Sequence, residues 1–237
     1  MRDTTEHDYF VPTRKHTYMT THYTFHHELI KLNKKVLKMS AMAEDRVRKA
    51  AEVIRTRDPE LIQWLIVSDY EVDEMEMEVE EECLKILALH QPVASDLRFI
   101  IMVIKVNSEI ERIADIAVNI AMRVQGIANS RWTVPSPYDY TEMADKVIAM
   151  LKMSLDALVN RDVKAARQVF LLDDEIDDMR TEAYHRVKDM IRLHPEHPGQ
   201  LINSYLIGRH LERIGDRATN IAEEVIYLVE GEIVRCP

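Results

Sequence analysis

Two acidic motifs, about a hundred residues apart, contain the side chains best suited to chemistry in this sequence. Each places a glutamate four positions before an aspartate, Glu111 before Asp115 and Glu212 before Asp216. On an α-helix, residues i and i+4 lie on one face a single turn apart, so each motif would present two carboxylates together. Carboxylate oxygens bind hard cations such as Mg²⁺, Mn²⁺, Ca²⁺ and iron, and can bridge more than one ion. The motifs therefore predict metal binding.

Two further pairs lie upstream of these motifs at the same spacing, Asp69 with Asp73 and Asp173 with Asp177. If the helices that carry them pack antiparallel, two pairs face each other in each half of the chain and four carboxylates converge. Clustered anions repel one another and require cations, for which a metal ion is a stronger solution than the neighbouring arginines. The predicted metal ligands are Asp69, Asp73, Glu111, Asp115, Asp173, Asp177, Glu212 and Asp216, with Asn119 and Asn220 as weaker candidates.

Acidic residues at this spacing are more often a solvated helix face, and this alternative stays open. The segment 69–82 holds nine acidic residues among fourteen, so a pair within it says little by itself. The glutamate–aspartate motifs are more informative, because they lie in less acidic segments and recur with matching neighbours. A helical adaptor without metal would share every one of these features except the bound ion.

The histidines give weaker signals. Three of them form a group near the N-terminus that is expected to lie on the surface: His22, His26 and His27. Glu182 and His185 form one glutamate–histidine pair of the ferritin type, but di-iron sites of that type need two such pairs. His210 is expected near the acidic site, because it lies two positions before the second motif.

The elements that must position the carboxylates come in two copies. Residues 110–121 (IERIADIAVNIA) and 211–222 (LERIGDRATNIA) are identical at eight of twelve positions, at an offset of 101. Upstream, an offset of 104 aligns Asp58 with Asp162, and also the two aspartate pairs. Chance similarity between helical segments would not keep one offset over such a stretch, so the chain is predicted to be an internal duplication.

Turn signals divide each copy into three helices. Asp58 is expected to cap a helix that has Pro59 at its first helical position. Glycine is scarce, at 5 residues, and aromatic residues make up 6%, which favours helices over sheets. The predicted helices are 22–56, 60–90, 94–126, 138–160, 163–194 and 200–230. The fold class is thus predicted to be all-α, with two tandem three-helix up-down bundles.

The duplication and the turn signals divide the chain into domains. The predicted domains are a flexible N-terminal extension (1–20), a first bundle (21–127), a linker (128–137) and a second bundle (138–231).

Charge and cysteine content narrow the range of functions that the chain could have. A formal net charge of −10 argues against nucleic acid as a partner. Cys83 and Cys236 form no disulfide framework, and neither a signal peptide nor a membrane span is visible, so a cytoplasmic protein is expected. No catalytic motif is recognisable, and we expect no enzyme.

The repeated motif, together with residues 94–98 (ASDLR) at the head of the third helix, resembles the signature of the PhoU family. The resemblance covers about residues 25–230. It implies two three-helix bundles related by a pseudo-twofold axis, often in a homodimer, with iron, zinc, manganese or magnesium ions on the acidic motifs. Two residues depart from the usual pattern without removing a ligand: Ala114, where glycine is usual, and Glu109, where aspartate is common.

The resemblance also implies a function. PhoU-like proteins connect the phosphate ABC transporter, through its ATPase subunit, to a membrane sensor histidine kinase, and they restrain phosphate uptake and phosphate-starvation signalling. Contact with the membrane is then expected only through these partners. An alternative is a metal-dependent hydrolase, since all-α nucleotide pyrophosphohydrolases also hold magnesium on helix-borne carboxylates. Glu80 and Glu81 supply only a fragment of the acidic element that such an enzyme needs.

Overall fold

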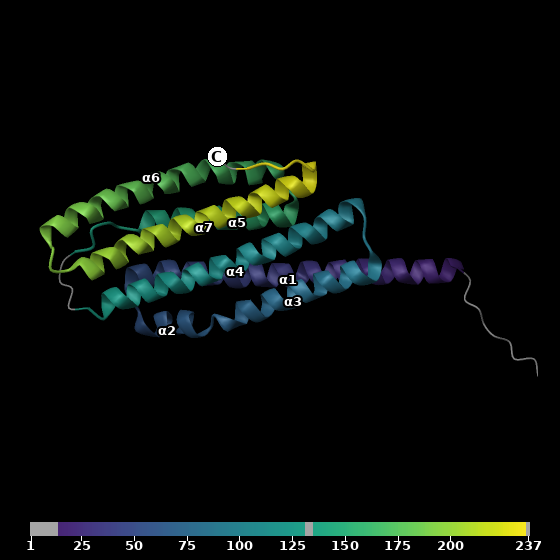
Figure 1. Cartoon of the computed structure of the whole chain (residues 1–237), viewed down its shortest axis with the longest axis horizontal. Coiled ribbons are helices and arrows are strands. Elements are labelled where there is room, and N and C mark those ends of the chain that lie inside the picture. The colour runs from purple at the N-terminus through teal and green to yellow at the C-terminus, as the bar shows by residue number, and fades with distance from the viewer. Residues whose placement is uncertain (1–13, 131–134, 236–237) are drawn as a thin grey trace, which may run out of the picture.

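The computed structural model describes residues 14–130 and 135–235, and these form long helices that run roughly along one axis (Figure 1). The helices are α1 (Arg14–Thr56), α2 (Pro59–Val67), α3 (Tyr70–His90), α4 (Ala94–Ala128), α5 (Thr141–Asn160), α6 (Val163–Leu193) and α7 (Pro198–Glu230). The first four pack together as one bundle, and α5, α6 and α7 form the second. The prediction of an all-α, duplicated bundle is confirmed.

One helix in each bundle begins with the same kind of N-cap, an aspartate side chain. The Asp58 carboxylate accepts hydrogen bonds from the backbone N–H groups at the start of α2, and Asp162 does the same for α6. Pro59 occupies the first turn of α2, where its missing N–H costs nothing. The predicted cap at Asp58 is confirmed. The predicted flexible extension falls largely on residues 1–13, which lie outside the described residues, and α1 begins at Arg14.

The predicted helix 60–90 is wrong as one continuous element, because it is interrupted at Ser68 and Asp69. The amides of Glu71 and Val72 bond to carbonyls three residues back, at 3.3 and 3.1 Å, in place of the usual four-residue spacing. The guanidinium of Arg46, on α1, donates to the Ser68 carbonyl. A tertiary contact from another helix thus satisfies a backbone group at the break.

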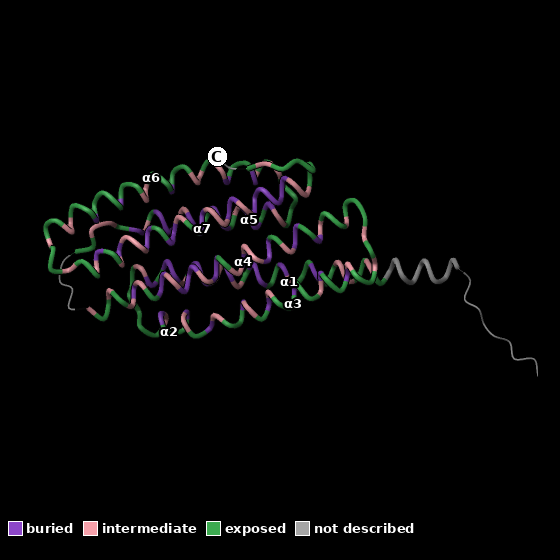
Figure 2. Tube along the Cα trace, in the orientation of Figure 1, coloured by how far each residue is buried: buried purple, intermediate pink, exposed green. Residues whose placement is uncertain are grey.

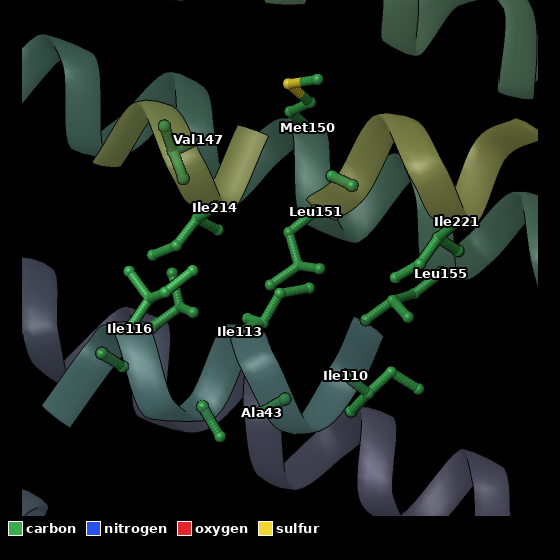
Figure 3. Packing of buried hydrophobic residues seen from close by; sticks show 14 of the residues in the cluster. Ala43, Ile110, Ile113, Ile116, Val147, Met150, Leu151, Leu155, Ile214 and Ile221 are labelled. Atoms are coloured by element: carbon green, nitrogen blue, oxygen red, sulfur yellow. The ribbon is translucent and has the colours of Figure 1, made fainter. Parts of the chain in front are cut away.

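One hydrophobic core runs through both bundles. Over the residues whose burial is described, the inner faces of the helices are mainly buried and the outer faces mainly exposed (Figure 2). α4 and α7 lie side by side in opposite directions and make the most extensive helix contact. Leu151 and Leu155 of α5 point toward Ile113 and Ile110 of α4, so the second bundle packs directly on the first (Figure 3). None of the helices described is long and apolar enough to cross a bilayer.

Gly208 of α7 marks a close approach that the core depends on. An added Cβ there would lie 2.7 Å from Cε1 of Tyr140, a residue only 3% exposed, so that the ring would have to shift. Gly208→Ala should therefore lower the free energy of unfolding by about 1–2 kcal/mol, because overpacking outweighs the better helix propensity of alanine. Chemical denaturation measures this change.

Gly199, in the first turn of the same helix, is the matched control, since an added Cβ there meets no atom within 4 Å. Gly199→Ala should leave stability unchanged or raise it slightly. Equal stability of the two variants would show that the Tyr140 ring does not restrict Gly208.

Candidate metal centre

The carboxylates predicted for the first bundle converge in part at one place, which we call the first cluster. Asp69 stands at the break before α3, Asp73 lies in the first turn of α3, and Asp115 projects from α4. One oxygen of each lies within 4.8 Å of one oxygen of the other two. Asp69 precedes α3 with a helical backbone conformation and caps no amide with its side chain, which stays available to the cluster. Three oxygens this close can surround a single cation.

Glu111 extends the first cluster by one turn of α4. Its carboxyl group shares a hydrogen bond with Asp115, which requires a proton between the two oxygens when no cation is present. Burial, followed by the negative charges of Asp115 and Glu76, raises the pKa of Glu111 to about 7. The environment therefore disfavours the charged form of this carboxyl group.

The first cluster also contains an acid that sequence reasoning missed. Glu76 lies on α3 one turn beyond Asp73, and burial followed by nearby carboxylates raises its pKa as well. Periodicity could have indicated it, since residues i and i+3 share a helix face. In the uniformly acidic segment 69–82, however, the sequence does not show which acids face α4.

The donor set of the first cluster fits a hard metal ion. Asp69 Oδ1 is buried without a hydrogen-bond partner, and such an orphaned oxygen requires an explanation. Within the described part of the chain, none of the cluster's carboxylates forms a salt bridge, and the nearby Arg46 pairs with Glu71 at 3.2 Å instead. Burial and the neighbouring carboxylates raise the pKa of Asp69 by more than the Arg46 charge lowers it, and oxygen ligands with so little counter-charge suit Mg²⁺, Mn²⁺, Ca²⁺ or iron.

The four acids predicted for the second bundle form a second cluster between α6 and α7: Asp173, Asp177, Glu212 and Asp216. Burial, followed by the Asp216 charge, raises the pKa of Asp173 to about 6. Gly215 lies close to this cluster, since a Cβ there would lie 3.3 Å from Asp173 Oδ1. One oxygen of Glu212, Oε2, is buried without a hydrogen-bond partner.

Arginines distinguish the second cluster from the first. Arg180 Nε lies 3.3 Å from Glu212 Oε1 and 3.6 Å from Asp177 Oδ1. A second guanidinium, that of Arg209, lies 3.8 Å from the same glutamate oxygen. Of the residues that the structure describes, no three acids here bring their oxygens as close together as those of the first cluster. Neither arginine contact was predicted from the sequence.

The weaker candidates lie beside the clusters with their amides engaged elsewhere. Asn119 donates to the backbone carbonyl of Asp115 at 2.9 Å, and Asn220 donates across to Glu109 at 3.2 Å. His210 is buried on α7, and burial followed by nearby arginines lowers its pKa to about 4. His26 and His27 are exposed, while the side chain of His22 lies outside the described residues.

Comparison with known proteins identifies relatives over both halves of the chain. The family model described as "PhoU domain" matches the chain twice, over residues 36–124 and 140–225. The phosphate-specific transport system accessory protein PhoU homolog of Pseudomonas aeruginosa is 35% identical over 214 residues, which cover 89% of this chain and 87% of that protein. The homolog of Clostridium acetobutylicum is 32% identical over 211 residues, covering 89% of this chain and 96% of that protein.

Solved structures give the same result. The crystal structure of PhoU from Pseudomonas aeruginosa matches with a TM-score of 0.83 at 34% identity, over 88% of this chain and all of that one (100%). The phosphate transport system regulatory protein PhoU from Streptococcus pneumoniae matches with a TM-score of 0.78 at 27% identity, over 89% and 99% of the two chains.

Fold and site together define a class of protein, a duplicated helical bundle that carries one acidic cluster in each half. The two domain matches and the relatives identify the family, and the chain belongs to the PhoU family. The resemblance noted in the sequence is thereby confirmed.

The raised pKa values predict how metal-free stability depends on pH. The folded state holds the Glu111 proton up to about pH 7 and the Asp173 proton up to about pH 6, whereas their ordinary values are 4.5 and 3.8. Between these limits the folded state binds more protons than the unfolded state, so stability falls as pH rises. In the presence of a chelator, the melting temperature should fall from pH 5 to pH 8.

The double variant Glu111→Gln with Asp173→Asn is the control, because its side chains resemble the neutral acids and do not titrate. Its melting temperature should fall less steeply than that of the wild type over the same range. Parallel slopes for the two proteins would contradict the assigned burial of these charges.

Proposed function

We propose that this protein is a negative regulator of phosphate uptake and phosphate-starvation signalling, which acts as a metal-binding adaptor rather than as an enzyme. The observation that carries the proposal is the family match over both halves of the chain. Relatives that cover most of its length are named as accessory proteins of the phosphate-specific transport system. We extend that role to this chain.

As such an adaptor, the protein would work in the cytoplasm, as a homodimer, between the ATPase subunit of the phosphate ABC transporter and its sensor histidine kinase. When phosphate is plentiful, it would keep the kinase from activating the starvation response. Its own contact with the membrane would run through these two partners. The acidic net charge supports protein partners over nucleic acid.

The metal ions would be held by the predicted carboxylates, which lie near the molecular surface and not in a closed core. Asp69, Asp115, Glu111 and Asp216 are all half-buried, so that a bound ion would remain within reach of a partner. An ion would neutralise the clustered charges and leave open coordination positions for an anionic group of the partner or for phosphate. The orphaned oxygens of Asp69 and Glu212 support this assignment.

The adaptor role predicts that partner binding depends on metal. The metal-loaded full chain should bind the transporter ATPase subunit and the cytoplasmic part of the kinase encoded in the same genome. Chelation, or the double variant Asp115→Asn with Asp216→Asn, should weaken that binding by about tenfold or more, because chelation removes the bound ions and the variant removes one carboxylate ligand from each cluster. Biolayer interferometry with each purified partner measures it.

The double variant Asp45→Asn with Asp189→Asn removes the same charge at two exposed helix positions outside the clusters and should bind as the wild type does. Partner binding that survives both chelation and the cluster variant would favour an adaptor without metal. Manganese-dependent hydrolysis of nucleotides by the purified chain would favour the hydrolase instead.

A further inference from the structure

The offset that relates the two clusters reveals one exchanged residue of opposite charge. An offset of 104 aligns Asp69 with Asp173 and Asp73 with Asp177. The same offset places Arg180 of the second bundle where Glu76 stands in the first. At this one aligned position the side-chain charges of the two bundles therefore differ by two units, from −1 at Glu76 to +1 at Arg180.

In the first bundle, the exchanged position adds an acid. Glu76 is half-buried on α3, and its backbone carbonyl accepts a hydrogen bond of 2.9 Å from the side chain of Asn107 on α4. This bond fixes the α3 turn that carries Glu76 against the helix that carries Asp115. The first cluster thereby holds five carboxylates, which are Asp69, Asp73, Glu76, Glu111 and Asp115.

In the second bundle, the same position supplies a cation inside the cluster. Arg180 reaches one carboxylate of its own helix, Asp177, and one of the facing helix, Glu212. Its side chain is only 28% exposed, so solvent screens these contacts less than it screens a surface pair. A guanidinium here places its positive charge beside two prospective ligands, although its Nε forms no hydrogen bond with either, and it repels an incoming metal ion.

The arginine beside the first cluster does not play this role. Arg46 is 2% exposed and donates to the Ser68 carbonyl and to Glu71, which is outside the set of clustered oxygens. The equivalent residue of the second bundle, at the same offset, is Met150. Arg46 therefore holds the helix break and only partly offsets the charge of Asp69, whereas Arg180 and Arg209 form direct ion pairs with acids of the second cluster.

We propose that the two clusters are not equivalent: the first, enlarged by Glu76, binds divalent cations tightly, and the second binds them weakly because Arg180 already serves as its counter-ion. The inference rests on the metal binding of the proposed function and adds that the two clusters differ in their affinity for divalent cations. A tight cluster would stay loaded in the cell, while the weak one would respond to changing cation supply.

Titration of the full chain with Mn²⁺ alone, after removal of metal with a chelator, tests this difference in affinity by isothermal calorimetry. The wild type should show two classes of site whose dissociation constants differ by about tenfold or more. Asp115→Asn should abolish the tight class and Asp216→Asn the weak class. Glu76→Gln should weaken the tight class alone, because it removes one charge and keeps the shape.

The decisive variants are at Arg180. Arg180→Met should strengthen the weak class by about tenfold and leave the tight class unchanged, because it removes the positive charge beside two prospective ligands. Arg180→Lys, which keeps the charge, should stay close to the wild type. Arg186→Met is the matched control, since that arginine of the same helix pairs with Glu182 in an exposed i,i+4 contact.

A folding defect would be recognised from the melting temperature, and Arg180→Gln then serves as the milder variant. Two classes of site that respond equally to Arg180→Met and to Arg186→Met would overturn the inference while the metal proposal stands. Failure of the wild type and of every variant to bind Mn²⁺ would overturn the metal proposal and this inference together.

Discussion

Like charges held a few ångströms apart repel, and in this protein the packing of long helices holds several carboxylates in that arrangement. Asp69, Asp73 and Asp115 share one small volume, and Glu111 keeps a proton near neutral pH because its surroundings disfavour another charge. The hydrophobic core behind α3 and α4 supplies the stability that offsets this repulsion. A cation that entered the cluster would relieve this repulsion directly, which is the physical basis of the metal binding that we propose.

The contact between α4 and α7, which we call the α4–α7 seam, joins the two bundles. Cross-bundle polar contacts set its antiparallel register, with Lys105 Nζ 2.8 Å from Glu224 Oε1 and Arg217 Nη1 3.2 Å from Glu109 Oε2. Since α4 and α7 each carry half of one cluster, the seam fixes the clusters relative to each other. The duplication thus places two acidic clusters in one molecule, and the exchange of Glu76 for Arg180 gives them different electrostatics.

Much of this arrangement could be predicted from the sequence, because helical periodicity and turn chemistry are local. The cap at Asp58, the duplicated bundles and the pairing of Asp69 with Asp73 follow from spacing alone. The helix break at Ser68 could not, because Arg46, 22 positions away, binds the Ser68 carbonyl at the interruption. Whether Glu76 belongs to the first cluster depends on how α3 is rotated about its axis against α4. The sequence of a uniformly acidic segment does not reveal that rotation.

Metal bound at the first cluster is the property on which the proposed function depends most. Anomalous X-ray diffraction at the manganese absorption edge, on crystals of the full chain grown with Mn²⁺, locates such ions without reference to any activity. The account predicts a strong anomalous peak between Asp69, Asp73 and Asp115, with a weaker one or none beside Arg180. Crystals saturated with Mn²⁺ that show no peak at the first cluster would contradict it.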